Sequence, residues 1–187
     1  MFGSIDPLLL LASLMVAATP ILLAAIGELV VERSGVLNLG VEGMMITGSI
    51  VGFIAAITTG SPWLGFIAAA LSGAAISLLF GILTQYLMSN QVATGLALTL
   101  FGLGLAALLG QGYLGVKAPA FPDWHIPLLG DIPVIGPIIF QHDPMVYVGL
   151  AIVAGVWWFL KKTRAGLVLR AVGENHEAAH ALGYHVV

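Results

Sequence analysis

The sequence predicts an all-α fold: a polytopic transmembrane helical bundle with about five spans. Of its 187 residues, 59% are hydrophobic and only 8% are charged, and the mean hydropathy is +1.06. Soluble domains carry about 25% charged residues, so a water-soluble globular fold is excluded. The sequence has no cysteine, which excludes disulfides and thiolate metal sites.

Five segments are apolar enough to be spans, given that a helix needs ~20 apolar residues to cross the hydrocarbon. They cover residues 7–31, 41–59, 63–87, 92–115 and 145–160. The first contains Pro20, which we expect to kink it. No basic residue precedes this first run, so we expect it to be a retained span and not a cleaved signal. The second and fifth segments are short unless flanking residues join them.

Small residues recur at four-residue spacing in three of these spans. They are Gly48 and Gly52, then Gly73, Ser77 and Gly81, then Gly102, Ala106 and Gly110. Such stripes let membrane helices approach closely. They predict a compact bundle and do not by themselves indicate a pore.

The basic residues predict the orientation of the spans. With five spans, one side holds five of the six basic residues, namely Arg33, Lys161, Lys162, Arg164 and Arg170. The other side holds Lys117 alone. The positive-inside rule then places residues 161–187 in the cytoplasm and the N-terminus outside.

Residues 116–144 form the long segment on the outer side in this orientation. They contain six of the nine prolines, which excludes a regular helix along the whole segment. The segment is also apolar, which argues against a free linker. We expect this extracytoplasmic loop to cap the outer mouth of a single transmembrane domain that covers residues 1–187.

A polar stretch at residues 32–43 interrupts the apolar sequence and contains three glycines. Polar, glycine-rich backbone at the edge of a span should be buried in protein or face water. Ionisable residues within a span are candidates for function. The stretch is either an ordinary cytoplasmic turn or a place where Asn38 and Glu42 line a water-accessible region.

The C-terminal segment predicts one short helix over residues 174–183. Asn175 suits its N-cap, Glu177 its first turn and Gly183 its C-terminal stop. A helix of about two turns is not stable alone in water. It must therefore dock on its own bundle or on a partner.

The same segment contains a complete H-E-x-x-H pattern, His176-Glu177-Ala178-Ala179-His180. In zinc proteases the two histidines bind the metal and the glutamate activates water. The extended form of the motif has a third histidine, where this chain has Val186. A membrane zinc metalloprotease is therefore an alternative function, although so short a pattern also arises by chance.

Three blocks of the chain resemble the permease subunit of bacterial ABC importers for nucleosides and simple sugars. Residues 32–45 are similar to the family's E-R-S-G-V-x-N-x-G-x-E-G-x-M. Residues 131–136 resemble its outer loop, and residues 163–183 its cytoplasmic stretch ending in R-A-V-G-E-N-x-x-A-A-x-x-x-G. Family members continue beyond the position of Val187, so we expect this chain to be a fragment.

The resemblance implies a transport subunit in the bacterial inner (plasma) membrane that is not itself an enzyme. It implies ABC ATPase subunits that carry ATP and Mg, a second permease subunit and an extracytoplasmic substrate-binding protein. We expect surrounding membrane lipid, no nucleic-acid partner, and neither a cofactor, a metal nor catalytic residues on this chain. A transporter that needs no ATPase is the other alternative.

Two sets of residues would carry this function. The resemblance places ATPase coupling on the cytoplasmic segment 161–187, at Arg170, Gly173, Glu174, Asn175, Ala178, Ala179 and Gly183. The candidates for the translocation path are polar residues near the span ends, namely Asn38, Glu42, Thr47, Gln91 and Thr94. Uncharged sugars and nucleosides need hydrogen-bonding groups more than charge.

Overall fold

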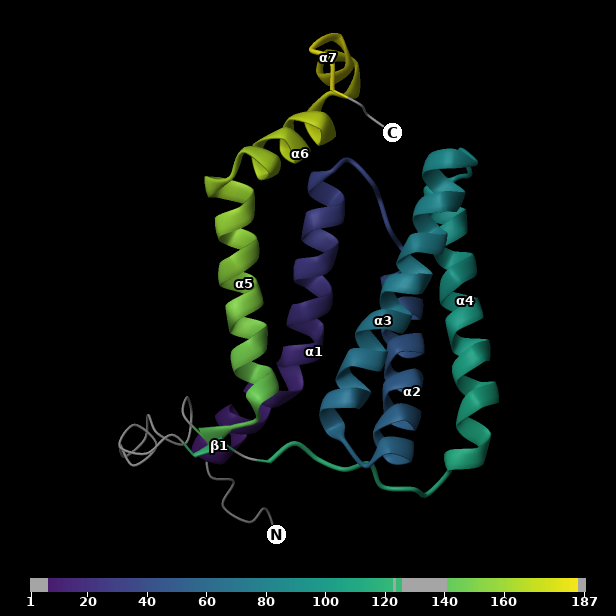
Figure 1. Cartoon of the computed structure of the whole chain (residues 1–187), viewed down its shortest axis with the longest axis vertical. Coiled ribbons are helices and arrows are strands. Elements are labelled where there is room, and N and C mark those ends of the chain that lie inside the picture. Colours follow the sequence, from purple (N-terminus) through teal and green to yellow (C-terminus); the bar gives the residue numbers. More distant parts are fainter. Residues whose placement is uncertain (1–6, 123, 126–140, 185–187) are drawn as a thin grey trace. The chain divides into compact units, whose positions relative to one another are not determined.

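The computed structural model describes residues 7–122, 124–125 and 141–184, and it confirms the helical fold class (Figure 1). The helices are α1 (Pro7–Arg33), α2 (Val41–Thr59), α3 (Pro62–Gly81), η1 (Ile82–Tyr86), α4 (Gln91–Gly110), η2 (Gln111–Tyr113), α5 (Pro144–Lys162), α6 (Arg164–Glu174) and α7 (His176–Ala181). The segment η1 is a π-helical turn that continues α3, and η2 is a 3₁₀ turn that follows α4.

Five of the described helical segments are long and apolar enough to cross a membrane. They are Pro7–Arg33, Val41–Thr59, Pro62–Tyr86, Gln91–Tyr113 and Pro144–Lys162, which match the five predicted spans closely. The two spans predicted to be short, α2 and α5, each have 19 residues. The first helix continues through Pro20.

Only the ends of the predicted outer segment are described. The strands β1 (Trp124–His125) and β2 (Gln141–His142) pair antiparallel, with Trp124 opposite His142. Asp143 is the N-cap of α5, and Pro144 is its first residue, where a missing N–H costs nothing. The predicted cap and the block at residues 131–136 lie outside the described residues.

The chain divides into two compact units. One comprises Met1–Gly27 with Phe121–Leu167, and the other Glu28–Ala120 with Val168–Val187. In the first unit α1 packs on α5. The two helices are so close that a Cβ added at Gly149 on α5 would lie 3.3 Å from Cγ2 of Thr19 on α1. Thr19 and Val146 are both buried.

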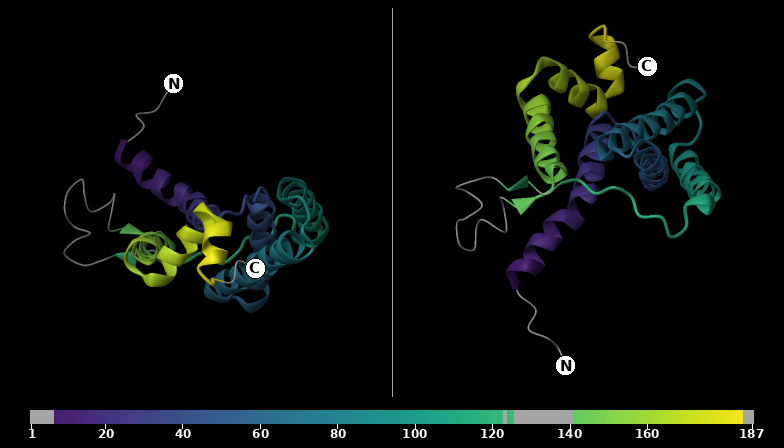
Figure 2. Two further views of the ribbon diagram at one scale, coloured as in Figure 1. Left: turned by 90° about the horizontal axis from the view of Figure 1, so that it is seen from above. Right: turned by 60° about the horizontal axis from the view of Figure 1, so that its bottom comes forward.

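In the second unit α2 packs against both α3 and α4 (Figure 2). Glycines allow these contacts: a Cβ added at Gly52 would lie 2.8 Å from the carbonyl oxygen of Gly65 on α3. A Cβ added at Gly102 on α4 would lie 2.5 Å from the carbonyl oxygen of Gly43 on α2. The predicted stripes at Gly52 and Gly102 therefore lie at helix contacts.

The stripe predicted on α3 is different. A Cβ at Gly73 would meet nothing closer than the Met44 carbonyl oxygen at 3.9 Å, and one at Gly81 would meet nothing within 4 Å. Gly73 is thus in ordinary van der Waals contact with α2, whereas Gly81 faces no neighbouring helix. Ser77 and Gly81 line a cavity instead.

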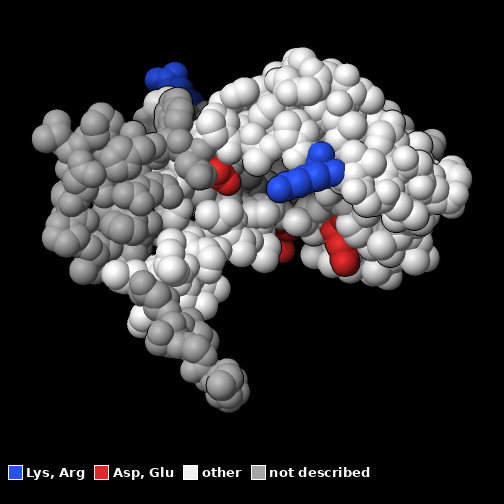
Figure 3. All heavy atoms as spheres, turned by 90° about the horizontal axis from the view of Figure 1, so that it is seen from below, with Lys and Arg blue, Asp and Glu red and all other residues white. Residues whose placement is uncertain are grey.

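Large apolar side chains cover the outside of the spans. Leu71 and Leu78 on α3 are each 67% exposed, and Leu100 on α4 is 70% exposed. Figure 3, which looks toward one end of the spans, also shows few charged side chains among the described residues of that end. Soluble monomers rarely leave such extensive apolar surface uncovered, so this surface is suited to lipid.

The C-terminal segment contains two helices where the sequence predicted one helix over 174–183. Glu174 is the last residue of α6, and α7 begins only after Asn175. The start of α6 has its own cap, because Oγ1 of Thr163 accepts a hydrogen bond from the Gly166 N–H at 3.0 Å. The predicted ends of the second helix are correct: Asn175 is the N-cap of α7, and Gly183 has a left-handed φ of +86°.

Candidate functional site

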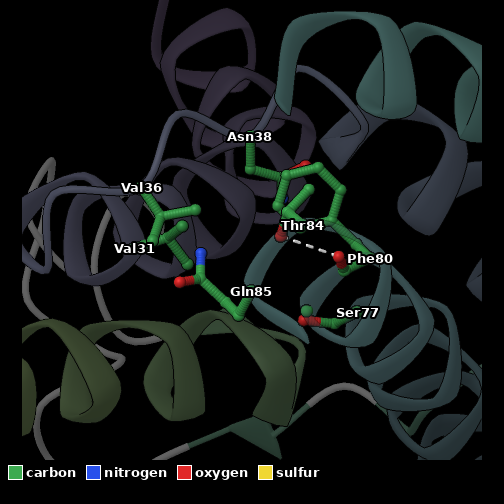
Figure 4. A pocket seen from close by; sticks show the side chains of 8 residues that line it. Val31, Val36, Asn38, Ser77, Phe80, Thr84 and Gln85 are labelled. Atoms are coloured by element: carbon green, nitrogen blue, oxygen red, sulfur yellow. Dashed lines mark hydrogen bonds between the residues drawn. The ribbon is translucent and has the colours of Figure 1, made fainter. Parts of the chain in front are cut away.

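The second unit contains a cavity of about 160 Å³ beside the point where the chain leaves α1 (Figure 4). Three segments build it: the end of α1, the loop at residues 34–40, and the continuous helix α3–η1. The lining residues are Val31, Val36, Asn38, Ser77, Phe80, Gly81, Thr84 and Gln85. None carries a charge, and four have hydrogen-bonding side chains.

Three of the lining residues are buried, namely Phe80, Thr84 and Asn38. Thr84 is 5% exposed, and its Oγ1 donates to the Phe80 carbonyl oxygen at 2.8 Å. Asn38 is 4% exposed, and its Oδ1 accepts from the Gly40 N–H at 2.9 Å. This bond spans two residues and is a local Asx turn, so the asparagine holds the loop in shape as well as lining the cavity.

Glu28 supports the same asparagine from within α1. Its Oε1 accepts the backbone N–H of Asn38 at 3.3 Å. No role for Glu28 was predicted from the sequence. The available signal was that it is the only ionisable residue between residues 7 and 31, where such a group is a candidate for function.

The loop at residues 34–40 is also fastened to α4. The Leu37 N–H donates to Oε1 of Gln91 at 2.8 Å, and Oγ1 of Thr99 donates to the Leu39 carbonyl oxygen at 3.3 Å. A Cβ at Gly95 would lie 2.8 Å from the Gly40 nitrogen. The start of α4 therefore lies directly against the loop backbone.

The other side of the loop contacts the C-terminal helices. A Cβ at Gly173 on α6 would collide with the Arg33 carbonyl oxygen and would lie 2.8 Å from the Gly35 nitrogen. A Cβ at Gly35 would lie 2.7 Å from Cε1 of His176. One loop thus contacts α1, α4, α6 and α7, all within the second unit.

The predicted path residues do not converge on one cavity. Asn38 lines the cavity described above, whereas Glu42 is exposed on the first turn of α2. Thr47 is buried, and its Oγ1 has no hydrogen-bond partner in the described part of the chain. Gln91 holds Leu37, as described above. Thr94 bonds Ser89 at 2.9 Å and lines a separate, largely apolar cavity.

Ser77 and Thr84 were not among the predicted site residues. They lie seven residues apart, which is two turns of a helix, so they share a face of α3–η1. Their spacing was visible in the sequence. What was not visible is that this face meets the loop that carries Asn38.

The predicted coupling residues occupy α6 and α7 in different environments. Ala179 is only 5% exposed and packs within the chain itself, whereas Ala178 is exposed. Oδ1 of Asn175 accepts from the Ala178 N–H at 2.9 Å. Gly173 packs on the loop, and Arg170 is half-buried on α6.

The geometry of the H-E-x-x-H pattern gives the zinc alternative no support. Across residues 7–122, 124–125 and 141–184, no group of three His, Cys, Asp or Glu side chains is placed to hold a metal ion. The helix that carries the pattern has six residues, and both His176 and His180 are exposed.

Five apolar helices, a neutral polar cavity at a broken span end, and short capped helices beside it define a multi-pass membrane transport protein. The chain belongs to the family of permease components of the branched-chain amino acid transport system, whose model matches residues 10–187. This confirms the predicted resemblance to transport permeases. It places the chain among plasma-membrane transport subunits.

Three relatives carry more specific names. A putative glucose ABC transporter permease protein of Haloferax volcanii is 41% identical over 174 residues, which cover 91% of this chain and 53% of that protein. A nucleoside ABC transporter permease protein of Lactococcus lactis is 33% identical, over a region that covers 95% of this chain and 60% of that protein. A guanosine ABC transporter permease protein of Bacillus subtilis is 33% identical, with 92% and 58% covered.

The chain thus spans between about half and 60% of the length of these relatives. No solved structure matches the chain at a significant level.

Proposed function

We propose that the chain is the membrane-spanning part of an ATP-driven importer for a nucleoside or a simple sugar. The observation that carries this proposal is the match, at 33–41% identity along more than nine-tenths of the chain, to relatives named as glucose, nucleoside and guanosine permeases. The cavity supports it, because its polar side chains are all neutral. Such a lining suits a cargo that carries hydroxyls and no charge.

The proposed assembly contains separate ATPase subunits that hold ATP and Mg, a second permease subunit and an external binding protein. In this proposal residues 161–187 face the cytoplasm and residues 116–144 face outward. The helices α6 and α7 bind the ATPase. Just after α7 the apolar side chains of Leu182 and Tyr184 are 78% and 46% exposed. Apolar side chains outside the spans are suited to a protein partner.

The loop at residues 34–40 offers a route from the ATPase to the cavity. It touches α6 and α7 through Gly173 and His176, and it carries Asn38 into the cavity lining. A rigid-body displacement of the C-terminal helices would therefore move a wall of the cavity. Such displacement of packed elements is a common form of conformational coupling.

The test compares two alanines of α7 in the complete transporter. We expect Ala178→Trp to weaken ATPase binding and uptake at normal membrane levels, because Ala178 is exposed. Ala179→Trp should instead destabilise the chain, because Ala179 is buried within it. Ala120→Trp, at an exposed alanine of the segment that faces outward in this proposal, is the matched control.

Further measurements separate the alternatives. His180→Gln should leave uptake unchanged, since exposed polar replacements shift stability within about 0.5 kcal/mol, whereas a zinc protease would lose activity. Uptake that continues after the ATPase subunit is removed would show a transporter that needs no ATP. Equal ATPase binding by Ala178→Trp and the parent protein would contradict the proposed docking.

A further inference from the structure

Two side chains in the cavity have unused hydrogen-bonding capacity. Within the described residues, the side chains of Ser77 and Gln85 make no hydrogen bond. Figure 4 shows the Gln85 amide extending from its helix into the space beside Val31 and Val36. Hydrogen-bonding groups without a partner in the protein are available to a ligand or to water.

The remaining walls complement these groups. Thr84 uses its hydroxyl hydrogen on the Phe80 carbonyl, which leaves its oxygen as an acceptor toward the cavity. The side chain of Asn38 is already held by the protein, because Nδ2 donates to the Met44 sulfur at 3.6 Å and the side chain also hydrogen-bonds the Glu28 carboxylate. Apolar side chains form the rest of the lining. Ligand sites characteristically combine apolar walls with a few placed polar groups.

The size of the cavity limits what it can hold. Its volume is about 160 Å³, close to the ~150 Å³ engineered cavity that takes up one benzene molecule. The cavity therefore has room for one five- or six-membered ring, and because it is partly open a group attached to that ring can extend out of it. Gln85 also lies on the π-helical turn η1, a form of backbone that occurs frequently at functional sites.

We propose that this cavity binds the sugar ring of the transported molecule, and that Gln85 and Ser77 hydrogen-bond its hydroxyls. The proposal rests on the proposed function and adds the binding site and the chemical group that it recognises. A hexose would place its whole ring in the cavity. A nucleoside would place only its ribose there and leave its base outside.

The experiment measures initial rates of uptake of labelled glucose and labelled guanosine by the complete transporter in membrane vesicles. The variants are Gln85→Met, which keeps the length of the side chain, and Ser77→Ala. Their matched controls are Gln111→Met, at an exposed glutamine of η2, and Ser72→Ala, whose hydroxyl bonds the Ala69 carbonyl on the same helix α3. Unlabelled ribose, glucose and guanine serve as competitors.

We expect each cavity variant to raise KM about three- to tenfold, the usual effect of losing one net hydrogen bond, with a smaller change in maximal rate. The controls should match the parent protein. If KM rises for labelled glucose, the ring in the cavity is that of a hexose. If KM rises for labelled guanosine, it is the ribose of a nucleoside. A free sugar should compete with uptake, guanine should not, and the free sugar should compete less well in Gln85→Met.

Two results would overturn the inference in distinguishable ways. If the parent protein transports either cargo and both cavity variants keep its KM, the cavity does not bind the sugar, while the proposed function stands. If the parent protein, at normal membrane levels, transports neither cargo, the proposed function fails and the cavity inference fails with it. Because Ser77→Ala only removes a hydroxyl from an exposed serine, it provides a readout even if Gln85→Met reaches the membrane poorly.

Discussion

At the residue scale, single glycines decide how closely the helices of the second unit approach. Gly102 lets α4 contact the backbone of α2 at Gly43, where a Cβ would meet a carbonyl oxygen at 2.5 Å. Two residues further along α4, a Cβ on Gly104 would meet nothing within 4 Å. The two positions share a helix and differ only in what lies opposite them.

This pair yields a direct prediction about stability. Gly102→Ala should destabilise the protein by about 1–3 kcal/mol, because overpacking forces the backbone of a packed region to shift. Gly104→Ala should be neutral or stabilising, because alanine favours helix over glycine by up to about 1 kcal/mol. Thermal unfolding of the purified protein in detergent measures both. Equal effects of the two changes would contradict the packing described for α4.

At the element scale, the loop at residues 34–40 is the element on which the others converge. It joins α1 to α2, receives hydrogen bonds or close contacts from α4, and touches α6 and α7. Gly35 makes this turn with a φ of +86°, a left-handed conformation that glycine adopts without steric cost. The loop is therefore held by its neighbours on several sides.

Gly173→Ala should separate α6 from this loop. The added Cβ would collide with the Arg33 carbonyl oxygen, and a backbone atom cannot rotate away as a side chain can. We expect uptake by the complete transporter to fall at least several-fold while the spans still insert. Gly155→Ala, at a position on α5 where a Cβ meets nothing within 4 Å, should leave uptake unchanged. Normal uptake with Gly173→Ala would show that this contact does not couple the helices to transport.

The short helix α7 depends on its cap. Asn175→Ala removes the Oδ1 acceptor of the Ala178 N–H, which costs about 1 kcal/mol. In a helix of six residues this loss should increase hydrogen exchange at the amides of the helix. Asn175→Asp supplies an equivalent acceptor and should restore slow exchange. Unchanged exchange in the alanine variant would mean that the cap does not hold the helix.

At the scale of the whole molecule, the number of spans and the side on which each connection lies determine what the protein can do. The parent sequence contains no cysteine, so single cysteines report accessibility without a background. Ala120 lies after the fourth span and Ala165 after the fifth, and both are exposed. One described span, Pro144–Lys162, lies between these two positions. We therefore expect Ala120 and Ala165 to lie on opposite sides of the bilayer.

We expect Ala120→Cys to react with an impermeant thiol reagent from outside intact cells and Ala165→Cys only after permeabilisation. The reason is the excess of Lys and Arg around residue 165, which the positive-inside rule places in the cytoplasm. Reaction of both cysteines from outside would refute this orientation, and with it the proposed docking of an ATPase on α6 and α7.

The sequence alone determined the features that depend on local physics. The five spans follow from hydrocarbon thickness and from the need of each backbone group for a partner within its own helix. The cap at Asn175 and the stop at Gly183 follow from bonds to neighbouring residues. The family resemblance was also present in local blocks, and the match over residues 10–187 confirms it.

The tertiary structure decided the site. Asn38 and Gln85 line one cavity although they are far apart in the chain, whereas the predicted candidates Glu42, Thr47 and Thr94 lie elsewhere. In a membrane span almost every face is apolar, so the pattern of residues does not tell which face meets a neighbour and which meets lipid. That choice comes from close backbone contacts such as Gly43 with Gly102, which form only when the helices pack.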